Sequence, residues 1–115
     1  MWAVSNRLRE AAQGAIQDAS AVYVSAATIW EIEIKRAAGR LQAPDDLIRT
    51  VDHSGYERLT ITFEHASEAA RLPPLHGDPF DRMLIAQARL ESMTLATSDE
   101  FILRYDVPVF QVSPA

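Results

Sequence analysis

Short apolar segments that alternate with helical segments constrain the fold of this chain more than any other feature. Four segments have the apolar character or the period-two pattern of strands, namely residues 21–24, 58–62, 93–97 and 108–110. Helical segments lie between them in the sequence. Strands that are separated by helices pair in parallel and have helices packed on them. The sequence therefore predicts an α/β sandwich with a short parallel sheet.

Capping residues mark where the helices are expected to begin and end. The strongest signal is Asp78-Pro79-Phe80-Asp81, where a capping residue precedes a proline at the first helical position. Ser25 is expected to cap a helix that runs to about Ala38 and ends at Gly39. Further helices are expected after Ser5, from residues 44–46 to His53, from Glu64 to Arg71, from Asp78 through Leu90, and from Asp99 to Tyr105.

Composition limits the classes of protein to which the chain can belong. A chain of 115 residues is expected to form one domain, residues 1–115. It has no cysteine, which excludes disulfides, thiolate metal sites and a cysteine nucleophile. A net charge of −5 argues against a globally basic nucleic-acid binder. No apolar run is long enough to cross a bilayer, and no secretory signal is evident.

Three carboxylates are placed where a functional site is expected. Ligands bind at the carboxyl ends of strands in open α/β sheets. Glu31 lies on the helix after the first strand, Asp81 on the first turn of the long helix, and Asp99 directly after the strand 93–97. Converging carboxylates can hold Mg²⁺ or a similar hard cation, which activates water and stabilises charge on a phosphodiester. These residues are the candidates for a metal-dependent catalytic site.

Each of these carboxylates also has a structural interpretation. Glu31 precedes Lys35 by four residues, the favourable order for a helical salt bridge. It also borders an apolar stripe of Ala27, Trp30, Ile34 and Ala38, which predicts partial burial. Asp81 and Asp99 lie at helix starts, where a carboxylate is favourable without any catalytic role.

The other polar and aromatic residues give weaker signals. The three histidines lack the spacing of a metal site and are expected on the surface, and both tryptophans are interpreted as packing residues. The basic side chains beside the carboxylates form either a solvated helical face or a patch that faces RNA. The histidines are His53, His65 and His76, and the tryptophans are Trp2 and Trp30. The basic residues are Lys35, Arg36, Arg40 and Arg82.

Several segments together resemble a known family. They are Val24-Ser25-Ala26-Ala27-Thr28-Ile29-Trp30-Glu31-Ile32-Glu33-Ile34-Lys35, Gly39-Arg40-Leu41, Asp78-Pro79-Phe80-Asp81-Arg82-Met83-Leu84-Ile85-Ala86-Gln87-Ala88 and Leu95-Ala96-Thr97-Ser98-Asp99. In this order and spacing they resemble PIN-domain proteins, and more closely the VapC toxins of VapBC toxin–antitoxin modules. The resemblance extends over almost the whole chain.

The resemblance implies a compact α/β/α fold and a Mg²⁺- or Mn²⁺-dependent endoribonuclease in a bacterial or archaeal cytoplasm. It implies Glu31, Asp81 and Asp99 as the acidic site, with Asp81 and Asp99 holding the metal and Glu31 orienting ligands or water. Asp78, Arg82 and Ser98 correspond to supporting or phosphate-contacting positions. The implied partners are RNA, a cognate VapB-type antitoxin and a second copy of the chain in a homodimer.

One departure from the family pattern concerns the N-terminus. The family opens with a central strand that carries its first metal-binding Asp, whereas this chain opens with a segment that resembles the part of the family pattern just after that strand. A late start codon, a truncation or a degenerate family member would each explain the difference. Without this strand, apolar surface at Val22, Val24 and Leu95 is expected to be exposed, which would favour association.

The same departure affects the expected function. The chain is expected to cleave RNA weakly or not at all, and an added strand with its Asp is expected to restore cleavage. The alternative function is a non-catalytic PIN remnant that binds antitoxin as a decoy or regulator. A third interpretation is a different Asp-dependent phosphate enzyme with a similar sheet.

Overall fold

Helices and short parallel strands make up the fold, as the sequence predicts. The structure is a computed structural model, and it describes residues 21–75, 77–97, 105 and 107–111. The elements of this part are β1 (Tyr23–Ser25), α2 (Ala26–Ala37), α3 (Leu47–His53), β2 (Glu57–Leu59), α4 (Phe63–Arg71), α5 (Pro79–Leu90), β3 (Leu95–Thr97) and β4 (Val109–Gln111). The helix expected after Ser5 lies outside the described residues, and so do residues 99–104 of the expected Asp99–Tyr105 helix.

The strands pair in parallel, but in two separate pairs. β1 pairs with β2, with Val24 opposite Arg58, and β3 pairs with β4, with Leu95 opposite Val109. The described residues thus form two two-stranded sheets where the sequence suggested one. The α/β class and the parallel pairing are confirmed.

Side-chain caps fix where the helices begin. The Ser25 hydroxyl accepts a hydrogen bond from the Ala27 amide at 3.0 Å, so the last residue of β1 is also the cap of α2. Asp78 caps α5 in the same way, and Pro79 follows at the first helical position. Gly39 ends the α2 region with a φ of +72°, a conformation that glycine adopts without strain. The strand predicted over residues 58–62 is shorter, because Thr62 caps α4 instead.

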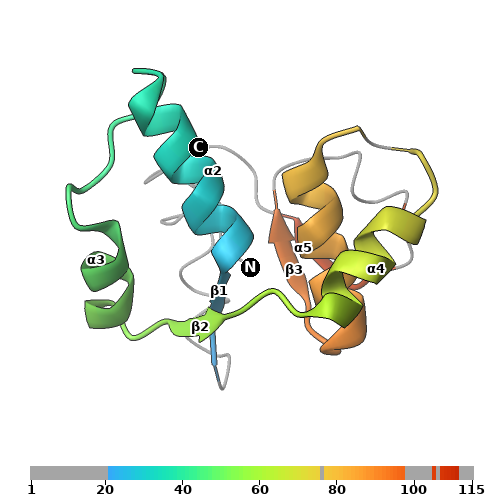
Figure 1. Cartoon of the computed structure of the whole chain (residues 1–115). Helices are drawn as coiled ribbons and strands as arrows, with labels where there is room; N and C mark the ends of the chain where they lie inside the picture. The colour runs from blue at the N-terminus through green and yellow to red at the C-terminus, as the bar shows by residue number, and fades with distance from the viewer. Residues whose placement is uncertain (1–20, 76, 98–104, 106, 112–115) are drawn as a thin grey trace.

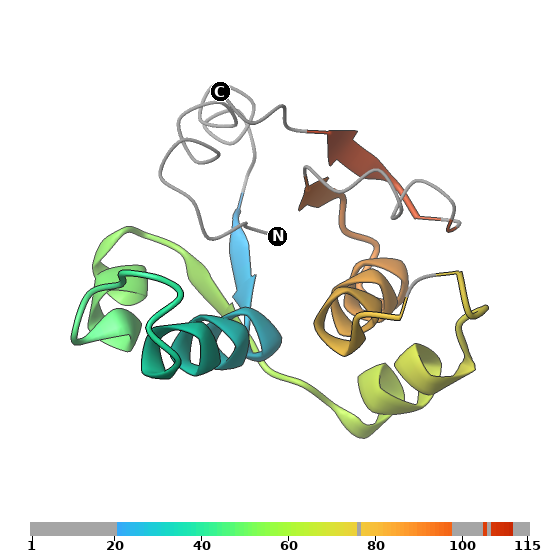
Figure 2. The same ribbon diagram turned by 90° about the horizontal axis from the view of Figure 1, so that it is seen from above.

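The elements gather in two groups (Figures 1 and 2). The N-terminal group contains β1, α2, α3 and β2, and the C-terminal group contains α4, α5, β3 and β4. The main cluster of buried apolar side chains belongs to the C-terminal group. Its members are Leu72, Ile85, Ala88, Leu95 and Tyr105. Among the described residues, no helix is long and apolar enough to cross a membrane.

Two expectations about exposure are wrong. Val24 and Leu95 are buried, because Leu95 packs on the core cluster and Val24 lies under α2 and α3. The helical stripe predicted for α2 is also incorrect. Trp30 is 63% exposed and Ile34 is exposed as well, whereas the buried side chains of α2 are Ala27, Thr28 and Ile32.

Candidate active site

Glu31 lies in the middle of α2 and has both of the features that the sequence suggested. Its side chain is 17% exposed, so the expected partial burial is confirmed. Its Oε2 atom is 3.3 Å from Nζ of Lys35, one helical turn later, so the expected salt bridge is present as well. A carboxylate that is half-buried and paired with a flexible lysine can exchange that ammonium for another cation with little rearrangement of the backbone.

Asp81 and Asp78 lie at the start of α5. Oδ1 of Asp78 accepts hydrogen bonds from the amides of Phe80 at 2.8 Å and Asp81 at 3.4 Å, which confirms its role as a helix cap. Asp81 is on the first turn and is half-buried. Asp78 thus acts as the cap of α5, and Asp81 stays the candidate site residue of this motif on the sequence grounds given above.

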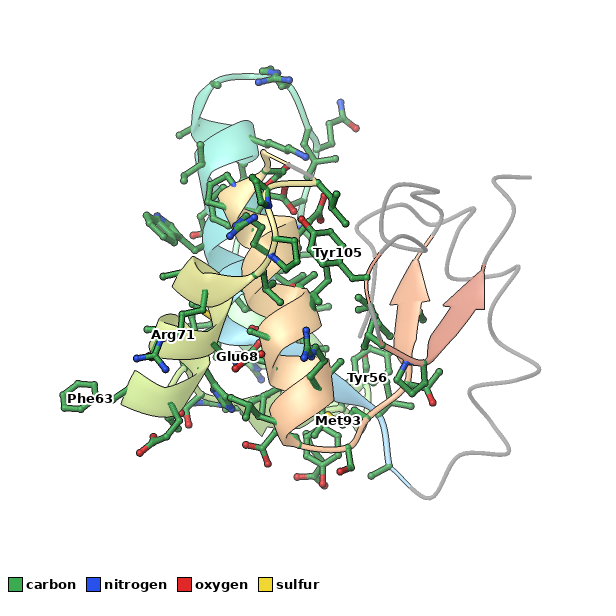
Figure 3. All side chains as sticks on the ribbon, turned by 90° about the vertical axis from the view of Figure 1, so that its right-hand side faces the viewer. Tyr56, Phe63, Glu68, Arg71, Met93 and Tyr105 are labelled. Atoms are coloured by element: carbon green, nitrogen blue, oxygen red, sulfur yellow. The ribbon has the colours of Figure 1, made fainter. Side chains whose placement is uncertain are left out.

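The two helices that carry Glu31 and Asp81 touch each other next to these residues. The rings of Trp30 and Phe80 meet edge to face, with centroids 5.1 Å apart and planes at 77°. Each ring belongs to the residue immediately before one of the carboxylates. Figure 3 shows that β3 points toward the end of the molecule where α5 begins. Asp81 therefore lies toward the carboxyl end of β3, as expected for a site in an α/β fold.

Asp99 and Ser98 lie outside the described residues, so the structure does not place the third candidate carboxylate. Within residues 21–75, 77–97, 105 and 107–111, no three His, Cys, Asp or Glu side chains are close enough to hold a metal ion. The donor chemistry of Glu31 and Asp81 suits a hard divalent cation. A metal site that includes these two residues would need a further ligand, and Asp99 is the candidate that the sequence offers.

The basic residues near the carboxylates are largely engaged within the protein. Lys35 pairs with Glu31, and the guanidinium of Arg36 bonds Glu33 and the carbonyl oxygens of Ala43 and Pro44. Both side chains are thus paired with a glutamate of the same helix. Arg40 is exposed beyond the end of α2.

Arg82, which follows Asp81, is directed at backbone carbonyl groups. Its Nη2 atom donates to the carbonyl oxygens of Ala69 at 3.0 Å and Leu72 at 2.8 Å, and Nη1 donates to that of Pro73 at 3.0 Å. These acceptors lie at the end of α4 and in the loop after it. The structure therefore gives Arg82 a role in joining α4 to α5.

A buried polar cluster near the other end of α5 was not expected. His65 is 1% exposed, so its predicted place on the surface is wrong. Its Nδ1 accepts from the Thr62 amide at 3.1 Å, Gln87 Nε2 lies 3.3 Å from the same atom, and its Nε2 is 2.8 Å from Oε1 of Glu91. The signal in the sequence was Thr62-x-x-His65, a capping box with His in the place of the usual Glu or Gln.

An apolar groove lies between α2, α3 and the β1–β2 pair. Its volume is about 320 Å³, and its walls are mostly apolar. At its edge Arg58 Nε and Nη2 bond the two Asp52 carboxylate oxygens at 3.0 and 2.6 Å. These hydrogen bonds hold the pKa of Asp52 below its ordinary value, and they raise the pKa of Arg58. The lining includes Ile29, Trp30, Ile48, Val51 and Leu59.

Comparison with known proteins agrees with this arrangement. A family model described as PIN domain matches residues 2–108, which is most of the chain. Domains of this family are generally nucleases that bind RNA and usually use divalent metal ions. No curated protein matches the chain. Because the match includes β1, α2, α5 and β3, with Glu31 and Asp81 on them, the chain belongs to the PIN-domain family.

Proposed function

We propose that the chain is a metal-dependent endoribonuclease of the VapC type, the toxin of a toxin–antitoxin module. The observation that carries this proposal is the contact of α2 with α5 beside Glu31 and Asp81, within a chain that belongs to a nuclease family. Asp99, two residues after β3, is the third proposed member of the site.

In the proposed site, Asp81 and Asp99 hold a Mg²⁺ or Mn²⁺ ion, and Glu31 orients ligands or water. The cation, when bound, supplies charge stabilisation for the phosphodiester and lowers the pKa of water. Glu31 must then release Lys35, whose ammonium group neutralises it in this structure. Asp78 supports the site by fixing the first turn of α5, and Ser98 is proposed to contact the ligands or the phosphate.

The test combines metal binding with RNA cleavage. We expect Mn²⁺ to bind the chain, and Asp81→Asn and Asp99→Asn each to weaken that binding by about tenfold or more, since each removes a proposed ligand charge. Cleavage of a mixed single-stranded RNA should be slow, sensitive to EDTA and lost in both variants. Asp45→Asn, an exposed residue before α3, is the matched control and should change neither result. Cleavage that persists in EDTA would contradict the proposed metal dependence.

A second candidate function is a non-catalytic PIN protein that binds an antitoxin as a decoy or regulator. The apolar groove beside α2 favours it, because Trp30 and Ile48 are more than half exposed there, and exposed apolar surface marks sites of protein association. Mn²⁺ binding separates the two functions, since the decoy requires none. Ile48→Glu should weaken capture of the antitoxin encoded beside the gene, whereas Asp81→Asn should not.

The proposed homodimer is supported by another exposed apolar side chain. Phe63, at the first position of α4, is 92% exposed and projects away from the helices (Figure 3). Light scattering of the wild type and Phe63→Ser tests whether this side chain contributes to association. A dimer that is unchanged in the variant would place the interface elsewhere.

A further inference from the structure

Arg82 and Tyr105 belong to one hydrogen-bond network around the loop between α4 and α5. The Tyr105 hydroxyl donates to the carbonyl oxygen of Pro73 at 2.8 Å and accepts from the Leu75 amide at 3.2 Å. Nη1 of Arg82 is 3.5 Å from the same hydroxyl and 3.0 Å from the Pro73 oxygen. Both side chains therefore bond the backbone of the loop between α4 and α5, and they share the Pro73 carbonyl oxygen as acceptor.

The network also serves the end of α4. The last carbonyl groups of a helix have no partner within the helix. Arg82 Nη2 donates a hydrogen bond to the carbonyl oxygen of Ala69, in the last turns of α4, and another to that of Leu72. Hydrogen bonds from a guanidinium are stronger than those between neutral groups, and the planar shape of the group allows it to bond several oxygens at once. α4 is thereby fastened to the residue that directly follows Asp81.

The Tyr105 side chain is an internal part of the fold. It is 5% exposed and belongs to the apolar core cluster, and it lies beside the N-terminal half of α5 (Figure 3). Its ring is thus fixed by packing while its hydroxyl bonds the loop. Because Tyr105 comes six residues after Asp99 in the sequence, it also anchors the chain just beyond the segment that carries that residue.

We propose that Arg82 and Tyr105 are positioning residues for Asp81. They fix the first turn of α5 against the end of α4 and against the core, so that the Asp81 carboxylate is held in one place before a ligand arrives. This inference rests on the proposed function, because the proposed function is what makes Asp81 a metal ligand. Of the two roles suggested for Arg82, it takes the supporting one, because the guanidinium bonds the carbonyl oxygens of Ala69, Leu72 and Pro73. Small displacements of a reacting group cost large factors in rate, so such anchoring is of direct consequence.

The experiment compares Arg82→Gln and Tyr105→Phe with Arg89→Gln. Arg89 is the matched control, because it lies on the same helix and reaches the same neighbouring helix through Glu68, at 3.6 Å, but is far along α5 from Asp81. Arg82→Gln and Arg89→Gln change the charge equally. Tyr105→Phe retains the buried ring and removes only the hydroxyl group. Mn²⁺ affinity is measured at a temperature where urea unfolding shows each variant to be fully folded.

We expect Arg82→Gln and Tyr105→Phe to weaken Mn²⁺ binding by about tenfold, the size seen when residues that orient metal ligands are changed. Arg89→Gln should change it less than about twofold, and Arg82→Lys should recover only part of the loss, because an ammonium group cannot bond the three carbonyl oxygens in the same geometry. Affinities within about twofold of the wild type in both Arg82→Gln and Tyr105→Phe would overturn the inference.

Amide hydrogen exchange separates this inference from the proposed function. In Tyr105→Phe we expect faster exchange at Leu75, whose amide loses the Tyr105 hydroxyl and keeps only the Pro73 carbonyl oxygen as acceptor, and at Asp81, with no change at Gln87. If the wild type binds no Mn²⁺, the metal part of the proposed function fails, and exchange alone decides the inference. Unchanged exchange at Asp81 would overturn it, whatever the metal result.

Discussion

The two groups of elements differ in how their interiors are built. In the C-terminal group, α5 contributes Ile85, Ala86, Gln87 and Ala88 as consecutive buried residues, and Leu95 of β3 is fully buried beside them. In the N-terminal group, the buried apolar side chains of the described residues are fewer and none belongs to the core cluster, and α2 and α3 leave an apolar groove open between them. One group is packed as a core, and the other keeps apolar surface available for contact.

The polar contacts follow the same division. The C-terminal group has part-buried hydrogen bonds, in which His65, Gln87 and Tyr105 join helices and loops that are far apart in sequence, besides the ion pair of Arg89 with Glu68. The N-terminal group has ion pairs near the surface, such as Glu31–Lys35 and Asp52–Arg58. Buried hydrogen bonds specify a structure, whereas exposed ion pairs contribute little to stability. The C-terminal group thus supports Asp81 rigidly, and the N-terminal group presents Glu31 on a more adaptable face.

The largest difference between the groups is expected from core truncation. Ile85→Ala should lower the free energy of unfolding by about 3 kcal/mol, because it removes buried methylene groups and leaves a cavity. Ile48→Ala, at a half-exposed position in the groove, should cost less than about 1 kcal/mol. Urea unfolding at 25 °C measures both. Equal losses would mean that the groove is as well packed as the core, and the distinction between the groups would not hold.

A smaller difference is expected from two histidines. His65→Ala removes the reciprocal cap of α4 and the contact with Glu91, so it should cost about 2 kcal/mol. His53→Ala, at the exposed end of α3, should cost less than about 0.5 kcal/mol. The same unfolding measurement distinguishes them. A cost for His65→Ala as small as that for His53→Ala would show that the cluster does not stabilise the C-terminal group.

The smallest contribution to the free energy of unfolding is expected from the Asp52–Arg58 pair, and this contribution depends on pH. Arg58 lowers the pKa of Asp52 in the folded chain. The resulting stabilisation is therefore present above the ordinary pKa of an aspartate, and it is lost as the pH falls through the lower, folded pKa. Arg58→Gln should return the pKa of Asp52 upward, while Arg49→Gln, on α3 like Asp52 itself, should not. Titration of the Asp52 carboxyl by NMR decides this, and equal pKa values in the wild type and Arg58→Gln would refute it.

Local signals predicted the helix starts well. Ser25 and Asp78 each cap a helix as predicted, and the helix predicted to open at residues 44–46 is capped by Asp46, because a cap depends only on neighbouring residues. Burial on α2 was predicted poorly. Its apolar stripe assumes one covered face, but Trp30 instead extends toward Phe80 and the open groove. Which face of a helix is covered depends on neighbours that are distant in the sequence.

The candidate site was predictable only in part, because some of its features depend on neighbouring residues and others on contacts between residues far apart in the sequence. Glu31 and Asp81 could be found from their positions after a strand and at a helix start, and α2 and α5 do touch beside them. Arg82 was singled out as a supporting or phosphate-contacting residue, but its partners could not be found, because they are carbonyl groups that any sequence provides. Tyr105 had no signal either, since its hydroxyl bonds residues about 30 positions earlier. The position of Asp99 stays a prediction.

The parallel pairing of the strands has a consequence for the order of folding. α4 and α5 are consecutive helices, so their contacts close a short loop and can form early. In the β1–β2 pair Tyr23 lies opposite Glu57, and the chain between these two residues contains all of α2 and α3. Closing this long loop costs more conformational entropy than closing the short loop between α4 and α5. The α4–α5 hairpin is therefore the expected nucleus, and the strands beside Glu31 are expected to acquire their register last.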